Sequence, residues 1–367
     1  MKVPFFDYSR AYTDDRADIM RIIDTVAGRG GFILQKELED FENNLAEFCG
    51  AERAIGVANA TDGLELAWMT AGLKPGDEVI CSAHTMLATA SSIVVAGGIP
   101  VPVDIEQDGL INPDAVSDAI NSRTRGIMPT QLNGRVCRMD KLMDIAKKND
   151  LLVVEDCAQA LGAKYDNKNA GTFGFASAIS FYPAKVLGCL GDGGAIIVNE
   201  PELYQTLYEL HDHGRGLDGK VKRWGRNSRL DNIQAAILDF RLKTYDTVIY
   251  RRRSIAGLYQ SRLGEIEELQ LPKGPSLTDV NFDIFQNYEI LATRRDELKC
   301  YLRERGVGSL IQWGGEALSQ IGELGMTAYL PATEDYFKRC LMLPMNCFLD
   351  DDNVHYVCDV ISDFYRS

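Results

Sequence analysis

Short apolar runs alternate with longer stretches of helical periodicity between residues 54 and 200. Several of these runs are apolar almost throughout, which is typical of strands covered on both faces. Between Met139 and Lys148, apolar positions recur at i, i+3, i+4 and i+7, which predicts a helix with one buried stripe. The predicted strands are residues 54–58, 78–82, 101–105, 126–131, 151–155, 178–182 and 195–199. Strands that alternate with helices predict right-handed crossovers and an α/β fold with a central, mostly parallel, seven-stranded sheet.

The pattern changes after Gly225. Residues 230–263 contain no proline and a single glycine, which predicts a long helix that bends and leads into a second unit. A strand at 287–291, a helix at 294–305, a strand at 308–312 and a final helix are predicted to follow. Asp350, Asp351 and Asp352 mark the start of that last helix, because acidic residues favour a helix N-terminus. We therefore expect a large α/β domain with an N-terminal arm at residues 1–245 and a smaller C-terminal α+β domain at residues 246–367.

Composition and charge narrow the functional classes. At about 150 residues per domain, a chain of 367 residues is expected to form about two domains. The 53 acidic and 39 basic residues give a formal net charge of −14, which disfavours nucleic acid and anionic membranes as partners. No apolar run approaches the roughly 18–20 residues of a membrane span. The nine cysteines are scattered without a CxxC pair, and the N-terminus lacks the apolar stretch of a signal peptide, so we expect reduced thiols and a cytoplasmic protein.

Two reactive residues follow predicted strands at the same edge of the sheet. Asp156 follows the run 151–155 and Lys185 follows the run 178–182, and ligands of parallel α/β sheets bind beyond the carboxyl ends of the strands. Pyridoxal phosphate needs such a pair, because a lysine amine forms its Schiff base and a carboxylate keeps its ring nitrogen protonated. The amine must lose its proton to react, so burial or a nearby cation should lower its pKa. Taken singly, a solvated lysine and a carboxylate that caps a strand end are equally good interpretations.

A glycine-rich segment and a helix start supply a candidate phosphate site. Four glycines between residues 188 and 194 let the backbone approach a ligand closely, although their spacing is neither that of a P-loop nor that of a Rossmann fingerprint. Residues 57–62 run from a strand into a helix that is predicted to begin near Asp62. Free amides at that helix start, together with the Thr61 hydroxyl, would bind an anion. The alternative is that Thr61 only caps the helix.

Five motifs occur in the order that characterises one family. They are residues 31–34 with 38–42, 59–66, 154–160, 180–185, and 225–231 with 234–236. On these motifs the chain resembles, over nearly its whole length, the DegT/DnrJ/StrS-type sugar aminotransferases, which are pyridoxal phosphate enzymes with the aspartate aminotransferase fold (fold type I). The resemblance implies this fold, with the cofactor in the large domain, and a cofactor that alternates between pyridoxal phosphate (PLP) and pyridoxamine phosphate (PMP).

The resemblance also implies a role for each residue that would face the cofactor ring. Lys185 would form the Schiff base and carry the proton between the substrate carbon and the cofactor. Asp156 would pair with the pyridine nitrogen, and Gln159 would lie against the ring near its phenolic oxygen. Where the family usually has an aromatic residue stacked on the ring, this chain offers Met86, whose thioether can lie on a π-face.

The phosphate group of the cofactor would have its own set of partners. The resemblance implies that Ala60 and Thr61 bind it by backbone amides and a hydroxyl, and that Ser180 adds a second hydroxyl. Ala60 stands where glycine is usual in the family. Asn227 would reach the phosphate of the neighbouring subunit, so the active site would be complete only in a homodimer.

For the reaction, the resemblance implies transfer of an amino group from L-glutamate to a keto-sugar carried on a nucleotide, with ping-pong kinetics. Residues 182–194 and 227–231 are more similar to the branch that acts on 3-keto sugars, and the 4-keto branch is the alternative. Segments 131–134 and 312–315 depart from the family pattern, which weakens the analogy for the substrate. The substrate candidates are His84, Trp313 and a group of cations suited to a diphosphate: Lys220, Lys222, Arg223, Arg226 and Arg229.

Two other functional classes, and a metal site, are less favoured. A related dehydratase would lack the lysine, so Lys185 argues against it. A non-catalytic regulator that binds the cofactor would need an interaction segment, and no basic segment typical of DNA binding is present. His211 and His213 lie at i and i+2 and would point in different directions on a helix, so no metal site is expected.

Overall fold

A seven-stranded sheet forms the centre of the larger unit in the computed structural model, which describes residues 2–276, 278–326 and 328–366. The strand order is β1-β9-β8-β5-β4-β2-β3. Strand β9 is antiparallel to β1 and β8, and the other neighbouring strands are parallel. The strands are β1 (Arg53–Val57), β2 (Glu78–Ser82), β3 (Ile99–Val103), β4 (Thr124–Met128), β5 (Leu152–Asp156), β8 (Ala176–Ser180) and β9 (Gly194–Val198). The predicted α/β fold with a mostly parallel seven-stranded sheet is confirmed.

Strand β3 begins two residues before the predicted run, at Ile99 instead of residue 101. It lies at the edge of the sheet and pairs only with β2, so that Pro100 and Pro102 face a single neighbour. Proline lacks the N–H that a second neighbour would require, and it is therefore tolerated on an edge strand.

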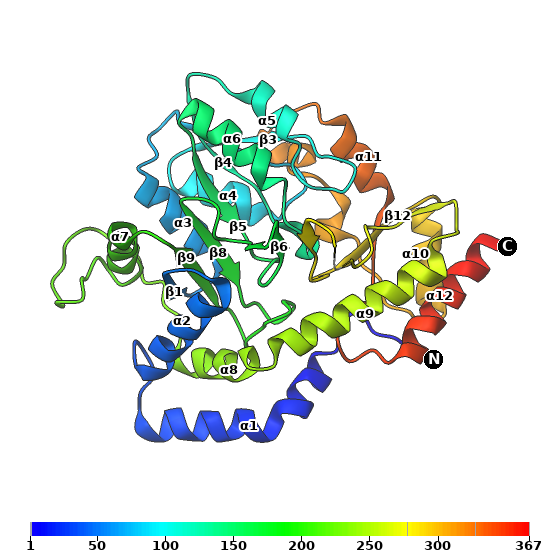
Figure 1. Cartoon of the computed structure of the whole chain (residues 1–367), viewed down its shortest axis with the longest axis horizontal. Helices are drawn as coiled ribbons and strands as arrows, with labels where there is room; N and C mark the ends of the chain where they lie inside the picture. The colour runs from blue at the N-terminus through cyan, green and yellow to red at the C-terminus, as the bar shows by residue number, and fades with distance from the viewer. Residues whose placement is uncertain (1, 277, 327, 367) are drawn as a thin grey trace.

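Helices cover both faces of the sheet (Figure 1). Consecutive residues of β5 point to opposite faces: Val153 packs in the same cluster as Phe41 of α2, and Val154 packs with Trp68 of α3. The stripe predicted between residues 139 and 148 is buried on α6. The helices of this unit are α1 (Tyr8–Arg29), α2 (Lys36–Cys49), α3 (Ala60–Ala71), α4 (Leu87–Val95), α5 (Pro113–Ala119), α6 (Met139–Asn149), α7 (Pro201–His211) and α8 (Asn232–Leu242).

The long helix predicted for residues 230–263 is divided into α8 and α9 (Tyr245–Leu263). The chain leaves helical geometry at Thr244, which has φ −116°. Figure 1 shows α9 running from α8 to the far end of the molecule, beside α10 and α12. Tyr245 and Ile249 pack in the core of the large sheet, whereas Tyr259 and Leu263 pack in a second core. Because α9 contributes to both cores, the domain boundary near residue 245 stays a prediction.

The second core belongs to a smaller α+β unit, as predicted. Its antiparallel sheet contains β10 (Leu269–Gln270), β12 (Tyr288–Ala292) and β13 (Cys340–Leu343), and its helices are α10 (Arg295–Glu304), α11 (Pro331–Arg339) and α12 (Asp351–Arg366). The prediction of a strand at 308–312 is wrong. Leu310 makes only an isolated bridge to Met342, and the chain turns at Gln312–Gly315, where the positive φ of Trp313 and Gly314 is incompatible with an extended strand. The apolar run of β13, which the sequence analysis did not single out, forms the third strand instead.

A third, small sheet connects the two units. It consists of β6 (Lys164–Tyr165) and β7 (Lys168–Asn169) from the larger unit and β11 (Asn281–Phe282) from the chain that enters the smaller one. At the N-terminus, Val3 bridges Val307 and packs in the second core. Over the ranges that the structure describes, we find no helix with the length and apolar character needed to cross a bilayer.

Candidate active site

A cavity of about 350 Å³ opens at the carboxyl ends of β5 and β8. Its volume lies at the lower end of the roughly 300–1,000 Å³ typical of small-molecule sites. It brings together seven of the eight residues predicted to contact the cofactor, which come from four separate stretches of the chain: Ala60, Thr61, Met86, Asp156, Gln159, Ser180 and Lys185. Trp313, a predicted substrate residue, also lines it. The sheet topology therefore gathers the reactive residues into one site.

Asp156 is the last residue of β5 and is buried at the floor of this cavity. One carboxylate oxygen accepts a hydrogen bond from Thr89 Oγ1 (2.7 Å), and the other accepts one from the Ala158 N–H (3.1 Å). Burial raises the pKa of Asp156, while these two bonds and the charge of Lys185 act in the opposite direction. A fixed carboxylate of raised basicity is a strong acceptor for a protonated ring nitrogen.

Lys185 lies in the connection that follows β8, where its N–H donates to the Tyr182 carbonyl (2.8 Å). Burial lowers the pKa of the Lys185 amine to about 8, although the charge of Asp156 tends to raise it. The structure thus does not present a fully solvated lysine. Near neutral pH, an appreciable fraction of this amine is unprotonated and able to react with a carbonyl carbon.

The phosphate segment is the N-terminus of α3. Asn59 caps this helix, because its Oδ1 accepts a hydrogen bond from the Asp62 N–H (2.8 Å). The helix begins at Ala60, two residues before the predicted start, and the interpretation of Thr61 as its cap is wrong. Ala60 and Thr61 occupy the first helical positions, where amides have no partner within the helix, and both line the cavity. This arrangement is suited to an anion.

Gly194, the first residue of β9, lies directly against this helix start. A Cβ atom at Gly194 would be 2.6 Å from the carbonyl carbon of Asn59 and 2.7 Å from the nitrogen of Ala60. Such distances are shorter than any ordinary contact, so only glycine lets the two backbones approach this closely. The glycine run noted in the sequence thus supports the anion site at this one position, whereas Gly191 has no close backbone neighbour.

Gln159 is oriented by two donors. Its Oε1 accepts hydrogen bonds from the Asn133 N–H (2.9 Å) and from Asn287 Nδ2 (3.3 Å). Because both bonds use the oxygen, the amide nitrogen of Gln159 remains available to an acceptor in the cavity.

The model of the DegT/DnrJ/EryC1/StrS aminotransferase family matches residues 13–362. The chain belongs to this family. This aminotransferase is 38% identical to a pleiotropic regulatory protein of Geobacillus stearothermophilus, covering 100% of this chain and 99% of the relative. It is 36% identical to the dTDP-3-amino-3,4,6-trideoxy-alpha-D-glucose transaminase of Streptomyces venezuelae, covering 99% of this chain and 96% of the relative.

Solved structures support the same assignment for the aminotransferase. The structure of S. venezuelae DesV in complex with a ketimine intermediate superimposes with a TM-score of 0.95 at 34% identity, covering 100% of this chain and 99% of that one. A Bacillus subtilis structure with bound PMP has a TM-score of 0.92 at 27% identity, covering 100% of this chain and 86% of that one. The family is PLP-dependent. The cavity fits this cofactor, since an amine, a buried carboxylate and a helix N-terminus face one space.

The exposed Met86 and the half-buried Trp313 form two further parts of the aminotransferase cavity. Met86 precedes α4 and is 50% exposed, and its Sδ accepts a hydrogen bond from the Ala88 N–H (3.1 Å). Trp313 has a positive φ of 48°, which turns its segment out of an extended path. Both side chains line the cavity, as the predicted contacts with ring and substrate require.

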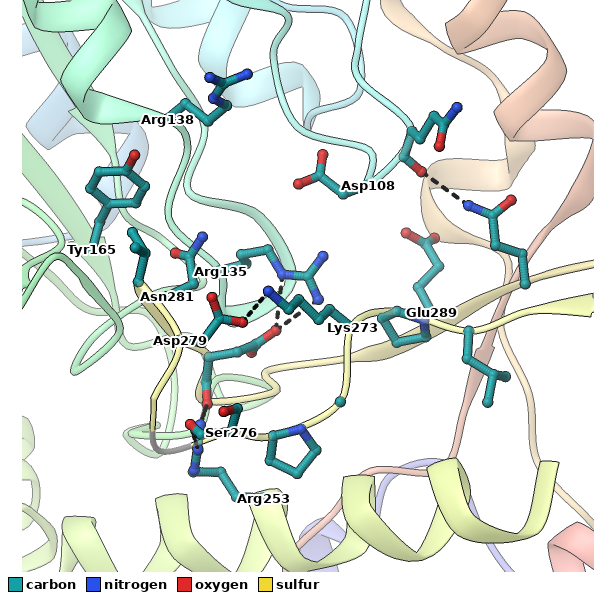
Figure 2. A pocket seen from close by; sticks show the side chains of 18 of the residues that line it. Asp108, Arg135, Arg138, Tyr165, Arg253, Lys273, Ser276, Asp279, Asn281 and Glu289 are labelled. Carbon is teal, nitrogen blue, oxygen red and sulfur yellow. Dashed lines mark hydrogen bonds and ion pairs between the residues drawn. The ribbon is translucent and has the colours of Figure 1, made fainter. Parts of the chain in front are cut away.

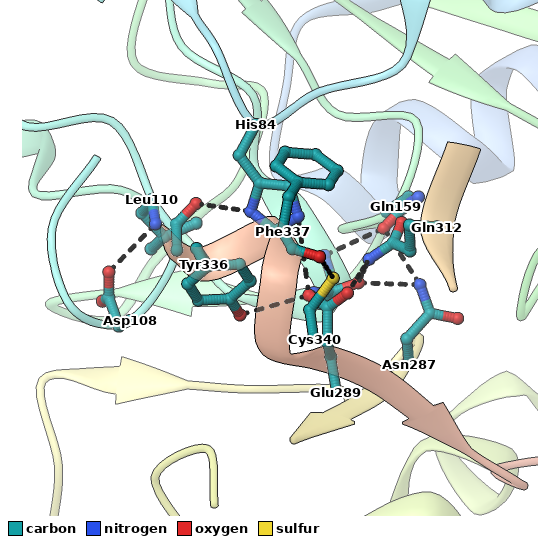
Figure 3. Close-up of polar contacts among 12 residues, drawn as sticks. His84, Asp108, Leu110, Gln159, Asn287, Glu289, Gln312, Tyr336, Phe337 and Cys340 are labelled. Carbon is teal, nitrogen blue, oxygen red and sulfur yellow. Dashed lines mark hydrogen bonds and ion pairs between the residues drawn. The ribbon is translucent and has the colours of Figure 1, made fainter. Parts of the chain in front are cut away.

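His84, in contrast, does not line the cavity. It is buried behind Trp313, with the two rings in an edge-to-face arrangement 5.5 Å apart. His84 Nδ1 lies 3.0 Å from the Gly109 carbonyl oxygen, and Nε2 lies 3.6 Å from Glu289 Oε2 (Figure 3). Burial lowers the pKa of His84, which favours the neutral ring. Direct contact of His84 with substrate, one of the sequence-based expectations, does not follow from this placement.

Asn227 and the candidate cations lie outside the cavity. They belong to the segment that follows α7, which stands away from the sheet in Figure 1, and Asn227 is exposed. Most of these cations are paired with acids of the same subunit: Lys222 with Asp218 (2.8 Å), Arg223 with Glu209 (2.6 Å), Arg226 with Glu65, and Arg229 with Asp212 (2.9 Å). Lys220 is exposed near the tip of the segment. Within one subunit, none of these residues lines the cavity that contains Lys185.

A second cavity of about 480 Å³, shown in Figure 2, lies where the two units meet. Two pairs of its charges contact each other: Arg135 bonds to Asp283 (3.0 Å), and Lys273 pairs with Asp279. Glu289 of β12 also borders this cavity. None of these residues stands out in the sequence, because nothing in the local pattern distinguishes them from surface charges.

Proposed function

We propose that this enzyme transfers an amino group from L-glutamate to the keto group of a nucleotide-linked sugar. The observation that carries this proposal is the single cavity in which Lys185, Asp156 and the α3 N-terminus meet. The S. venezuelae relative is named for an amino group at sugar position 3, which supports a 3-keto substrate ahead of a 4-keto one.

PLP, when bound, supplies a conjugated ring that acts as an electron sink. The protein supplies positioning and proton transfer. Asp156 keeps a proton at the ring nitrogen, and Thr89 fixes the carboxylate that does so. Lys185 Nζ would accept the proton from the α-carbon of the amino donor and pass it to the cofactor. In the second half-reaction, it would deliver a proton to the sugar carbon that receives the amino group. A pKa of about 8 suits both steps, because the amine and its protonated form are both populated near neutral pH.

The remaining residues would anchor the cofactor. The amides of Ala60 and Thr61 and the hydroxyls of Thr61 and Ser180 would bind the phosphate, and Gln159 would donate its amide hydrogen to the phenolic oxygen. Met86 would lie over the ring, and Trp313 would bound the space left for the sugar. These assignments are supported by the fact that all six side chains or backbones line the same cavity.

We also propose that the active form is a homodimer in which Asn227 completes the phosphate site of the partner subunit. The segment after α7 supports this, since Leu217, Val221 and Trp224 on it are 76%, 68% and 96% exposed. Large apolar side chains at that level of exposure are typical of an interface. Lys220 and Arg229 would then lie near the nucleotide diphosphate bound to the neighbouring subunit.

The reverse reaction gives a direct test. Purified protein, PLP, 2-oxoglutarate and a panel of nucleotide-linked 3-amino and 4-amino sugars should yield L-glutamate with at least one 3-amino sugar. Lys185→Ala should form no glutamate. Production of glutamate only from 4-amino sugars would show that the substrate is a 4-keto sugar and not a 3-keto sugar.

The name of the G. stearothermophilus relative makes regulation the second candidate function. A non-catalytic regulator would bind PLP but exchange no amino group with any donor. A wild-type protein that binds PLP stoichiometrically, yet leaves every amino acid and amino sugar unchanged, would therefore favour regulation over catalysis.

A further inference from the structure

The two segments that depart from the family pattern, 131–134 and 312–315, meet on one buried carboxylate. Glu289 is 4% exposed and lies on β12. Its Oε2 accepts a hydrogen bond from Asn133 Nδ2 (2.8 Å), and its Oε1 accepts one from Gln312 Nε2 (3.1 Å). Tyr336 OH adds a third bond, to Oε2 (3.2 Å). Asn133 and Gln312, which lie 156 and 23 positions from Glu289 in the sequence, thus both bond to the same carboxylate.

A carboxylate can only accept hydrogen bonds, so it fixes the orientation of every amide that contacts it. The nitrogen of Asn133 must face Glu289, which turns Asn133 Oδ1 away. That oxygen accepts bonds from Asn287 Nδ2 and Gln312 Nε2, both 2.8 Å long. Figure 3 shows Gln312 and Asn287 between Glu289 and Gln159. The result is a polar cluster, Glu289–Asn133–Gln312–Asn287, in which donors and acceptors have one consistent direction.

This cluster reaches the cavity at two points. The Asn133 N–H and Asn287 Nδ2 both donate to Gln159 Oε1, and Gln159 lines the cavity. Gln312 immediately precedes Trp313, whose ring lines the cavity from another side. Asn133 and Trp313 both have positive φ, 57° and 48°. Asparagine adopts this conformation comparatively readily, whereas for the bulky Trp313 it is strained and must be held by its surroundings. The bond from the preceding Gln312 to Glu289 holds the start of that segment.

We propose that Glu289 is a positioning residue that orients Gln159 and Trp313 through Asn133 and Gln312. The inference rests on the proposed function, because it assumes that Gln159 and Trp313 face the cofactor and the sugar. Glu289 itself does not line the cofactor cavity. Its contribution is to keep the carbonyl oxygen of Gln159 directed into the cluster, so that the amide nitrogen is presented to the cavity.

The test is Glu289→Gln, which keeps the shape of the side chain but replaces one acceptor by a donor. An amide hydrogen would then face either Asn133 or Gln312, and the consistent direction of the cluster would be lost. We expect the PLP dissociation constant of the apo-protein to rise about tenfold, with a shift in the visible absorbance maximum of the bound cofactor. In a Gln159→Ala background, the same substitution should change PLP affinity by less than about twofold.

Two further variants guard against a merely structural effect. Asn133→Gly keeps the backbone N–H and the positive φ but removes the link to Glu289, so it should reproduce the effect of Glu289→Gln. Tyr336→Phe removes a donor to the same oxygen that does not lead to Gln159, so its PLP affinity should stay within about twofold of wild type.

Equal losses of affinity from Glu289→Gln with and without Gln159 would overturn the proposal, as would wild-type affinity in both Glu289→Gln and Asn133→Gly. Failure of the wild-type protein to bind PLP would instead refute the proposed function. If Glu289→Gln does not fold, Asn133→Gly and its combination with Gln159→Ala provide the same comparison.

Discussion

Gly194 provides the sharpest test of the phosphate site. Replacing it by alanine places a methyl group 2.6 Å from the Asn59 carbonyl carbon and 2.7 Å from the Ala60 nitrogen. Carbon contacts are normally about 3.5–4.0 Å long, so the start of α3 must move by about 1 Å relative to β9. Both atoms are backbone, and neither can avoid the methyl group by changing a rotamer.

Overpacking of this kind costs about 1–3 kcal/mol. A third contact, 2.9 Å from the Ile179 carbonyl oxygen in β8, lowers the stability of the free and the PLP-bound protein alike. The free protein relieves the contacts with Asn59 and Ala60 by shifting the α3 start, whereas a bound phosphate requires the amides of Ala60 and Thr61 in place. Most of the cost of these two contacts should therefore appear as lost affinity for PLP. At 1.4 kcal/mol per factor of ten, the dissociation constant should rise roughly 5- to 150-fold.

The assay is a titration of apo-protein with PLP, followed by visible absorbance, with thermal unfolding of the apo-protein measured in parallel. Gly191→Ala is the matched control, because its nearest neighbour is Gln234 Nε2 at 3.5 Å, an ordinary contact. It should bind PLP within about twofold of wild type. If Gly194→Ala bound PLP as tightly as Gly191→Ala, the α3 start would not be the phosphate site.

Three further predictions concern charge. Because burial lowers the pKa of Lys185 to about 8, the rate at which apo-protein captures PLP should rise with pH with a midpoint near 8, and Lys185→Ala should show no capture. Burial raises the pKa of Glu42 to about 7. Between about pH 4.5 and 7, Glu42 therefore stays protonated in the folded protein while it ionises in the unfolded chain. The free energy of unfolding should fall by up to about 3 kcal/mol over this range. Urea unfolding of Glu42→Gln should lack that decline, and an unchanged pH profile would contradict the burial of Glu42. Thr89→Val removes a donor to the buried carboxyl group of Asp156 and should destabilise the apo-protein by about 1–3 kcal/mol, measured by urea unfolding. A variant as stable as wild type would show that Asp156 does not depend on this donor.

Much of the large unit could be predicted from local pattern. Strands buried on both faces are apolar throughout, so the runs themselves located the sheet, and residues just after them located the carboxyl edge where ligands bind. Asp156 and Lys185 were found in this way, before any contact was known. The predicted start of edge strand β3 was two residues too late, because prolines, which an edge strand tolerates, are atypical of a strand.

The residues that sequence reasoning missed depend on contacts between distant parts of the chain. Asn59, not Thr61, caps α3, a choice between two polar residues two positions apart that only the backbone geometry decides. Strand β13 is a run of four residues whose partner, β12, precedes it by about fifty positions. Glu289 resembles any other acid in a strand until the structure brings Asn133 and Gln312 to it. The only local signal was that segments 131–134 and 312–315 both departed from the family pattern.

The reversed direction of β9 has a consequence for how such an enzyme can change. Because β8 and β9 are antiparallel, Ser180 pairs directly with Gly194, and the intervening residues 181–193 leave and rejoin the sheet at a single point. The lysine is therefore carried on a closed loop whose base is clamped by main-chain pairing. Insertions or deletions within that loop would alter the reach of the amine while leaving the strand register intact, which makes this connection a natural place to graft or evolve a different reactive geometry.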